Sequence, residues 1–201
     1  NGMTGTRWKT AAILLLAAIL CAGAAPRREA GDDLIGTVAP LFDLEHWLNS
    51  DPLEIAALRG KVVLVHWWTD TCPFCAATAP VLRELDRSYR ERGLRVIGIF
   101  HPKPPGDASL ERLRSSTDRF GFLFPVALDA DWTALGRWWL DSRKRGWTSV
   151  SFLVDRNGRI RYVHPGGEFH PGPGGNHWPD HQTCNREYEE IVALIEELLK
   201  N

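Results

Sequence analysis

The stretch that decides the fold runs from residue 62 to residue 75 and reads Val62-Val63-Leu64-Val65-His66-Trp67-Trp68-Thr69-Asp70-Thr71-Cys72-Pro73-Phe74-Cys75. Its first seven residues, 62–68, form a continuous apolar run rich in β-branched side chains, which is typical of a central strand buried on both faces. From residue 73 to residue 92, apolar side chains recur at helical spacing, and Gly93 follows. The sequence therefore predicts a buried strand, a short loop that ends in a cysteine, and a helix that begins directly after that cysteine.

Strand and helix signals alternate on both sides of this stretch. The other expected strands are 41–44, 94–100, 122–128, 150–154 and 159–163, and the other expected helices are 107–119, 131–139 and 187–200. Alternation of strands and helices predicts parallel strands joined by crossover helices. Residues 155–158 read Asp-Arg-Asn-Gly between two strand-like runs, which is a hairpin signal and adds antiparallel strands. We therefore expect an α/β fold whose central mixed sheet is flanked by helices.

The N-terminal residues have the layout of a secretory signal peptide. Two basic residues precede an uncharged apolar run at 11–22, and small residues follow it. The run is short for a membrane span, which needs roughly 20 apolar residues. We therefore expect a signal peptide or an uncleaved N-terminal anchor at 1–25, a linker at 26–33 and one domain at 34–201. This organisation predicts a periplasmic or other extracytoplasmic location.

Charge and cysteine content narrow the class of protein. The net charge of −1 gives no reason to expect nucleic acid or an anionic membrane surface as a partner. Of the four cysteines, Cys21 lies in the expected leader, which leaves Cys72, Cys75 and Cys184. An odd number, with two cysteines almost adjacent, does not suit a disulfide scaffold. Cysteine chemistry is the better interpretation.

The pair Cys72 and Cys75 has a mechanism built into its spacing. Pro73 suits the first position of a helix, where its missing N–H costs nothing, so Cys72 is expected at the N-cap. Unpaired N–H groups and the positive end of the helix dipole stabilise a thiolate there. Cys75 lies one turn deeper on the same face, within reach of a disulfide. We therefore expect Cys72 to attack a substrate and Cys75 to resolve the mixed disulfide.

Metal binding is the alternative interpretation of the same pair. Two cysteines at this spacing also occur as zinc ligands, but zinc normally needs a second ligand pair at an ordered spacing. We assign no metal to the two cysteines.

A family resemblance rests on these residues. Residues 65–75, with Pro80 five positions on, resemble the thioredoxin superfamily. Residues 60–65, 152–158 and the extra segment 120–139 resemble its exported, redoxin-like TlpA/ResA branch. The resemblance covers residues 34–201.

The resemblance implies a fold and an activity. The fold would be a thioredoxin-like three-layer sandwich with a TlpA-type insertion. The activity would be that of a thiol–disulfide oxidoreductase, in disulfide reduction or cytochrome c maturation, which acts on protein thiols and disulfides. A membrane partner would supply electrons. We expect no cofactor and a monomeric protein.

Three positions depart from the family pattern. Thr71 stands where the family usually has Trp before the first cysteine. His66 stands where thioredoxins carry a buried Asp that helps to deprotonate the resolving cysteine, so the resemblance suggests that His66 is a general base for Cys75. Ser149 stands where the family usually has a cis-proline that faces the disulfide. The residues expected to contact substrate are Trp68, Thr71, Pro73, Phe74, Ser149 and Val150.

A loop rich in histidine follows the last expected strand. Within 21 residues it holds His164, Glu168, His170, His177, His181 and Cys184. Imidazole and thiolate are good ligands for zinc or copper, but this spacing matches no ligand template. The loop is therefore a solvated surface loop, a metal site, or a frame for the cysteine centre. His101, at the end of another expected strand, points to the same edge of the sheet.

Two other functions stay open at this point. Thr69-Asp70-Thr71-Cys72 echoes the T-x-x-C of thiol peroxidases of the peroxiredoxin kind, although those enzymes usually carry a proline upstream of the Thr and residues 62–68 have none. A copper or zinc chaperone would use the cysteine pair with histidines of the loop.

Overall fold

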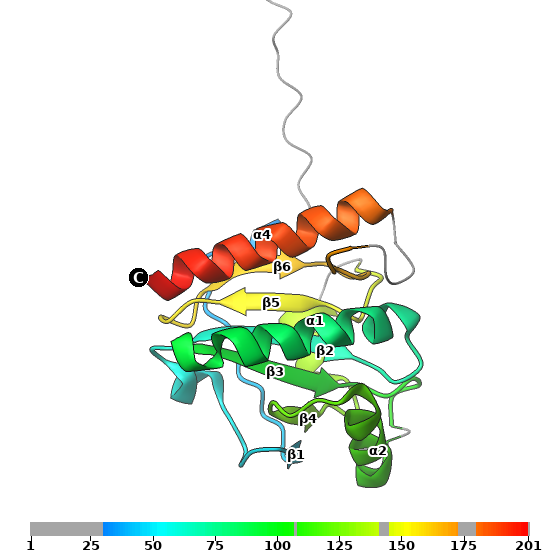
Figure 1. The fold of residues 1–201 in the computed structure, drawn as a ribbon. Helices are drawn as coiled ribbons and strands as arrows, with labels where there is room; N and C mark the ends of the chain where they lie inside the picture. Colours follow the sequence, from blue (N-terminus) through cyan, green and yellow to red (C-terminus); the bar gives the residue numbers. More distant parts are fainter. Residues whose placement is uncertain (1–29, 107, 141–144, 173–179, 201) are drawn as a thin grey trace, which may run out of the picture.

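A six-stranded mixed sheet forms the centre of the molecule (Figure 1). The computed structural model describes residues 30–106, 108–140, 145–172 and 180–200. The strands are β1 (Trp47–Leu48), β2 (Val62–Trp68), β3 (Leu94–Phe100), β4 (Val126–Leu128), β5 (Ser151–Val154) and β6 (Ile160–His164), in the order β1-β4-β3-β2-β5-β6. β2, β3 and β4 are parallel, and the other pairings are antiparallel. The predicted mixed sheet is confirmed.

Helices and helical turns surround this sheet. The α-helices are α1 (Pro73–Tyr89), α2 (Leu110–Phe120), α3 (Thr133–Leu135) and α4 (His181–Lys200). Short 3-10 helices are η1 (Asp32–Leu34), η2 (Ile55–Leu58) and η3 (Arg90–Arg92), and a π-helical turn, η4 (Gly136–Leu140), continues α3. Figure 1 shows α1 and α4 side by side on one face of the sheet, with α2 near its β4 edge.

The two faces of the sheet are packed into two separate cores. On the first face Leu64 and Trp68 of β2 pack with Leu82 of α1 and Ile195 of α4. On the second face the neighbouring residue Trp67 packs in a cluster of aromatic side chains with Phe42, Trp138 and Phe152. Successive side chains of a strand point to opposite faces, which explains why β2 is buried along its whole length.

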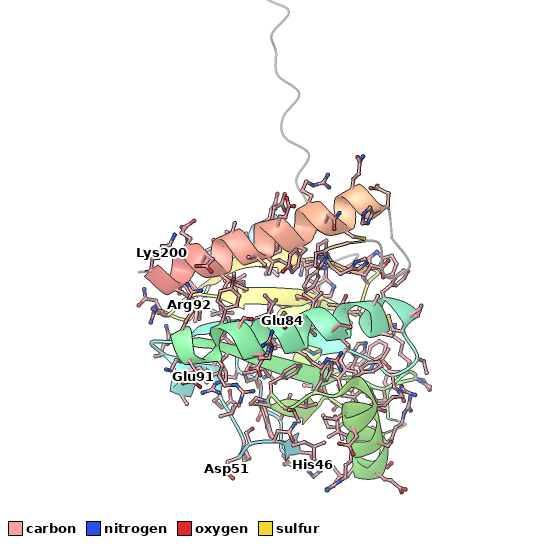
Figure 2. The ribbon with its side chains drawn as sticks, viewed as in Figure 1. His46, Asp51, Glu84, Glu91, Arg92 and Lys200 are labelled. Atoms are coloured by element: carbon pink, nitrogen blue, oxygen red, sulfur yellow. The ribbon has the colours of Figure 1, made fainter. Side chains whose placement is uncertain are left out.

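Charged side chains lie at the outer ends of these helices. Figure 2 shows Arg92 and Lys200 at the same end of the molecule, where α1 gives way to η3 and where α4 ends. The Arg92 guanidinium donates to the carboxylate of Glu196 on α4, at 2.6 Å. This exposed pair joins the two helices that cover the first face, with a small contribution to stability.

Turn chemistry explains two boundaries. At the β5–β6 hairpin Gly158 has a φ of 69°, in the left-handed region that favours glycine, and its N–H donates to the carbonyl of Asp155 at 2.8 Å. Gly93, with a φ of 108°, ends the helical segment α1–η3 in the same way. Both were expected from the sequence, and both are confirmed.

Other boundaries differ from the predictions, each for a local reason. Residues 41–44 are not a strand, because Asp43 has a φ of 54° and its N–H donates to the carboxylate of Glu54 at 2.7 Å. Strand β4 begins only after Pro125, which has no N–H to donate to a neighbouring strand. Helix α4 begins at His181 rather than at residue 187, because Asp180 accepts the N–H of Thr183 at 2.9 Å.

The expected leader, 1–25, lies outside the described residues. Of the expected linker, residues 30–33 are described; Asp33 there forms an ion pair with Arg145, at 2.8 Å. Within the described residues no helix is both long and apolar enough to cross a membrane.

Candidate active site at the start of α1

Helix α1 begins at the cysteine pair. Cys72 is the N-cap residue, with extended backbone angles, and Pro73 takes the first helical position as expected. The Cys72 sulfur accepts the backbone N–H of Cys75 at 3.4 Å. Cys72 is half-buried and Cys75 is only 1% exposed. In the reduced protein a partner protein can therefore reach the sulfur of Cys72 but not that of Cys75.

The two cysteines also differ in acidity, in opposite directions. The Cys75 thiol, the N–H groups of Cys75 and Phe74 and the Ser149 hydroxyl lower the pKa of Cys72 to about 5, against the opposing effect of burial. Burial, followed by the hydrogen bond to Cys72 and the charge on Cys72, raises the pKa of Cys75 well above its usual value. At neutral pH the half-buried sulfur is a thiolate and the buried sulfur is a thiol, which is the assignment that an attacking and a resolving cysteine need.

Ser149 connects the two sulfurs. The thiol of Cys75 donates to Ser149 Oγ at 3.0 Å, and the Ser149 hydroxyl donates to the Cys72 sulfur at 3.7 Å. Ser149 comes from the segment just before β5, on the far side of β2 from β3. Among the described residues the single cis peptide bond is Lys103–Pro104, so the bond before Ser149 is trans. The position expected to contact substrate thus holds a hydroxyl that hydrogen-bonds to both cysteines.

A Ser149→Ala substitution tests this hydroxyl. We expect the pKa of Cys72 to rise by about one unit, since a hydrogen bond to an ionised sulfur is lost. Less stabilisation of the thiolate favours the disulfide, and about one pKa unit corresponds to a reduction potential about 30 mV more negative. The pH dependence of iodoacetamide alkylation gives the pKa, with a wild-type midpoint near 5, and a glutathione redox titration gives the potential. An unchanged midpoint in the folded variant would show that the hydroxyl does not stabilise the thiolate.

His66 lies in the middle of β2, in the interior of the first face. It is 2% exposed, and its Nδ1 is 2.8 Å from Ser151 Oγ on β5. Burial, and then the charges of His164 and His101, lower its pKa to about 3, so the ring is neutral at neutral pH as expected. The Cys75 thiol donates its hydrogen bond to Ser149 and not to His66. The role of His66 as a base for Cys75 stays a prediction.

The residues expected to contact substrate divide into two groups. Thr71 and Pro73 are exposed and Phe74 is half-buried beside them. Trp68 and Val150, in contrast, are both 0% exposed, so their side chains belong to the cores and do not face a substrate. The sequence analysis missed Trp147, which is 41% exposed and packs edge-on against Phe74 with ring centroids 5.6 Å apart.

A second feature that the sequence analysis missed is an ion pair that holds the loop before Cys72. Arg112 of α2 donates to both carboxylate oxygens of Asp70, at 2.9 and 2.8 Å, and Arg119 donates to the Asp70 carbonyl at 2.8 Å. The hydrogen bond from Arg112 is the largest cause of the lowered pKa of Asp70. Helix α2 therefore fixes the backbone two residues before the attacking cysteine.

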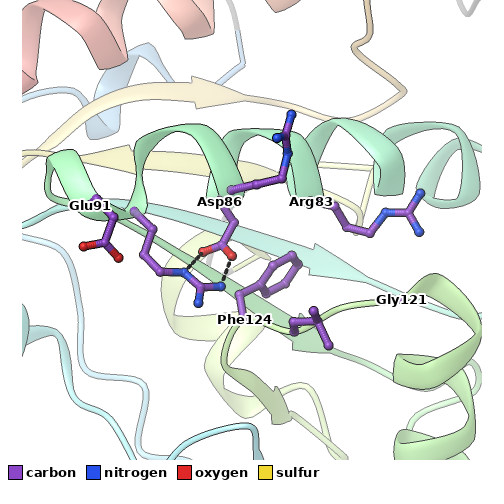
Figure 3. A pocket seen from close by; sticks show the side chains of 8 residues that line it. Arg83, Asp86, Glu91, Gly121 and Phe124 are labelled. Carbon is purple, nitrogen blue, oxygen red and sulfur yellow. Dashed lines mark hydrogen bonds and ion pairs between the residues drawn. The ribbon is translucent and has the colours of Figure 1, made fainter.

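A cavity lies away from the cysteines, beside the second half of α1. It has a volume of about 390 Å³ and lies between the second half of α1 and the segment after α2, with Asp86 and Phe124 on its walls. Figure 3 shows the Asp86 carboxylate hydrogen-bonded to Arg90 at this cavity. None of the residues predicted for the site lines it.

The histidines near this end of the sheet are largely buried. His101 is 0% exposed and its Nε2 is 2.9 Å from Thr148 Oγ1, next to Ser149. His164 of β6 is 1% exposed and its Nε2 is 3.1 Å from Glu187 Oε2. His170 is buried as well, whereas His181 is exposed. His177 lies outside the described residues. The description of the loop as solvated is therefore wrong for His164 and His170, which pack inside the domain.

Known proteins share part of this sequence. Protein DipZ of Mycobacterium bovis is 29% identical over 131 residues, which are 64% of this chain and 18% of that protein. The thiol–disulfide oxidoreductase ResA of Halalkalibacterium halodurans is 27% identical over 132 residues, 66% of this chain and 69% of that protein. The chain thus spans less than a fifth of the length of DipZ and a little over two thirds of this ResA.

Solved structures share the fold. A thiol–disulfide isomerase from Corynebacterium glutamicum matches with a TM-score of 0.61 and 26% identity, over 81% of this chain and 97% of that chain. A thioredoxin-like superfamily protein matches with a TM-score of 0.63 and 22% identity, over 82% of this chain and 97% of that chain. The expected thioredoxin-like fold and the resemblance to the ResA branch are confirmed. A family model described as the AhpC/TSA family matches residues 35–163, and because this is more than half of the chain, the chain belongs to the AhpC/TSA family.

Proposed function

We propose that this protein is an extracytoplasmic thiol–disulfide oxidoreductase that exchanges the Cys72–Cys75 dithiol or disulfide with protein substrates. The observation that carries the proposal is the opposite perturbation of two cysteines on one helical turn, with the pKa of Cys72 lowered to about 5 and that of Cys75 raised. The names of the ResA relative and of the isomerase from C. glutamicum support it.

The exchange takes two steps. The Cys72 thiolate attacks one sulfur of a substrate disulfide, the substrate S–S bond breaks, and one substrate cysteine leaves as a thiolate. Cys75 then loses its proton and attacks the Cys72 sulfur, which releases the second substrate thiolate and leaves the Cys72–Cys75 disulfide. Two electrons pass to the substrate, and an electron donor must reduce the disulfide again before the next cycle.

Formation of the mixed disulfide itself prepares the second step. Two of the causes that raise the pKa of Cys75 are the hydrogen bond to Cys72 and its negative charge. Both disappear once the Cys72 sulfur is bonded to the substrate, so the pKa of Cys75 falls when Cys75 has to become the attacking thiolate. Burial remains, and a nearby base is still needed to accept the proton.

The exposed surface beside Cys72 suits an extended peptide segment. Phe74 and Trp147 form an apolar edge next to the half-buried sulfur, and Thr71 and Pro73 lie exposed on the neighbouring turn. Aromatic side chains of this kind supply contact area with little loss of conformational freedom. This surface is the proposed substrate contact.

His66→Leu tests the proposed base. If His66 accepts the proton of Cys75, through Ser149 or a water molecule, the variant should resolve the mixed disulfide about 100-fold more slowly while its formation by Cys72 is unchanged. Stopped-flow fluorescence with a peptide disulfide separates the two steps, and circular dichroism checks the fold. If both steps keep their wild-type rates in the folded variant, His66 has a packing role only.

Catalysed reduction of insulin by dithiothreitol tests the activity as a whole. We expect turnover that depends on Cys72 and is faster than peroxide consumption by the same protein. The match to the AhpC/TSA family model makes a thiol peroxidase the second candidate, which is the reason for the direct comparison. Peroxide turnover above the rate of disulfide exchange would favour that candidate.

The location and the electron donor are part of the proposal. The signal-peptide layout of residues 1–25 supports export. An exported dithiol protein lies beyond the reach of cytosolic reductants, so a membrane protein is the proposed electron donor. The proposed oligomeric state is a monomer. Fusion of residues 1–33 to an alkaline phosphatase that is active only after export tests the location; an inactive fusion would contradict it.

A further inference from the structure

Three side chains of metal-ligand type meet where the segment after β6 passes beneath the first turn of α4. Glu168 and His170 come from that segment, and Cys184 comes from α4. One ligand atom from each side chain lies within 4.8 Å of the others, and the His170 Nε2 is 3.9 Å from the Glu168 Oε2. The three residues are 0%, 5% and 0% exposed, in that order. Carboxylate, imidazole and thiol groups thus converge in the interior rather than on the surface.

The spacing is close to that of a tetrahedral metal centre. Zinc binds imidazole nitrogen and carboxylate oxygen at about 2.0 Å and thiolate sulfur at about 2.3 Å, so that tetrahedral ligand atoms lie roughly 3.3–3.6 Å apart. The present separations, of up to 4.8 Å, exceed these by at most about 1.5 Å, which side-chain rotation can close. Three protein ligands leave the fourth position of such a centre to water.

Charge and surroundings favour a cation at this place. A carboxylate and a thiolate ligand together carry two negative charges, which a divalent cation bound between them would balance. Glu187, whose carboxylate is 3.1 Å from His164, lies one turn beyond Cys184 on α4. The ring of Phe169 packs against His164, with centroids 4.9 Å apart, and closes the region on the side of β6. Residues that surround a metal site in this way hold its ligands in place and limit the access of solvent.

A route from solvent reaches the cluster. A cavity of about 260 Å³ opens beside α1 and α4, and its lining includes Pro80 and Glu84 of α1, Tyr188 of α4 and His170 itself. An ion therefore has an entry path that does not pass the redox cysteines.

The geometry points to a zinc site formed by Glu168, His170 and Cys184, separate from the Cys72–Cys75 pair. A thiolate and an imidazole suit zinc, and the hard carboxylate oxygen makes the set less suitable for Cu(I), which prefers soft ligands throughout. The thiolate excludes Mg²⁺ and Ca²⁺, which take oxygen ligands. The ion ties the segment after β6 to the first turn of α4, and so holds the chain beside Phe169, which also packs against His66.

Metal content and cobalt spectra test the site. The full chain, purified without a polyhistidine tag and under reducing conditions, should bind about one Zn²⁺, measured by elemental analysis and by competition with a chromogenic chelator. Co²⁺ in its place should show a thiolate-to-metal charge-transfer band. Cys184→Ala and His170→Ala should weaken zinc binding by more than about 100-fold, since even partners outside the ligand shell contribute about 10–100-fold. If either of these variants fails to fold, Glu168→Gln, which keeps the shape of the side chain, should likewise weaken zinc binding.

Two controls separate this site from other ligands. The double variant Cys72→Ser, Cys75→Ser should keep both the zinc and the cobalt charge-transfer band, and His181→Ala, on the exposed side of the same helical turn, should keep its zinc. Zinc that is lost with Cys72 and Cys75 and retained by Cys184→Ala would place the metal at the redox pair and overturn the inference. Absence of bound zinc in the reduced protein, or preference for copper over zinc in competition, would overturn it as well.

Discussion

Replacement of Cys75 by serine should trap this protein in a covalent mixed disulfide with its substrate, whereas replacement of Cys72 should abolish the reaction. In the first variant the half-buried Cys72 thiolate still attacks, but no thiol remains to release the product. In the second variant Cys75 is the remaining cysteine of the pair; it is 1% exposed and has a raised pKa. We expect turnover to fall by at least about 100-fold in both variants.

Burial decides the size of this effect more than ionisation does. A thiolate of higher pKa is intrinsically more nucleophilic, and this offsets much of the loss from its small ionised fraction. The Cys75 sulfur, however, lies behind Cys72 with Ser149 as its hydrogen-bond partner, at 3.0 Å, so a protein disulfide does not reach it. Mass spectrometry of the protein after reaction with a peptide disulfide measures the adduct. Equal trapping by the two variants would contradict the assignment of roles.

Asp129→Ala should cause a large loss of stability. Asp129, directly after β4, is 0% exposed, and its carboxylate accepts the N–H groups of Leu135 at 2.7 Å and Ala134 at 3.1 Å and the indole N–H of Trp67 at 3.3 Å. Alanine leaves these buried donors without an acceptor, at a cost of about 1–3 kcal/mol each. It also removes the cost of burying the carboxylate, and this burial is what raises the pKa of Asp129. We expect a net loss of about 3 kcal/mol.

Urea unfolding measures this loss as a lower midpoint with an unchanged slope. Asp131→Ala is the matched control, because Asp131 is exposed and accepts one N–H, that of Thr133, at 3.0 Å. Its substitution should cost less than about 1 kcal/mol. Similar losses for the two variants would show that the buried carboxylate does not hold α3 to β2.

Much of the fold could be read from local patterns. The run at Val62–Trp68 is apolar at every position except His66. This pattern is typical of a strand buried on both faces, and β2 lies between β3 and β5. Pro73 after Cys72 predicted the first turn of α1, because N-cap preferences depend on neighbouring residues alone. Predictions failed where distant groups replaced local bonds, as at Asp43, whose N–H binds Glu54 and prevents a strand.

By itself the sequence determined the order of strands and helices, the hairpin at Gly158, and the cysteine pair at the start of a helix, because periodicity, turn preference and capping act over a few residues. Only the tertiary structure decided what surrounds the sulfurs. Ser149 meets Cys75 from 74 positions away, and Arg112 holds Asp70 from 42 positions away. Glu168 and Cys184 likewise converge only because α4 packs over the sheet. Such contacts depend on how packed layers bring separate segments together, and no pattern of neighbouring residues predicts which distant residues will meet.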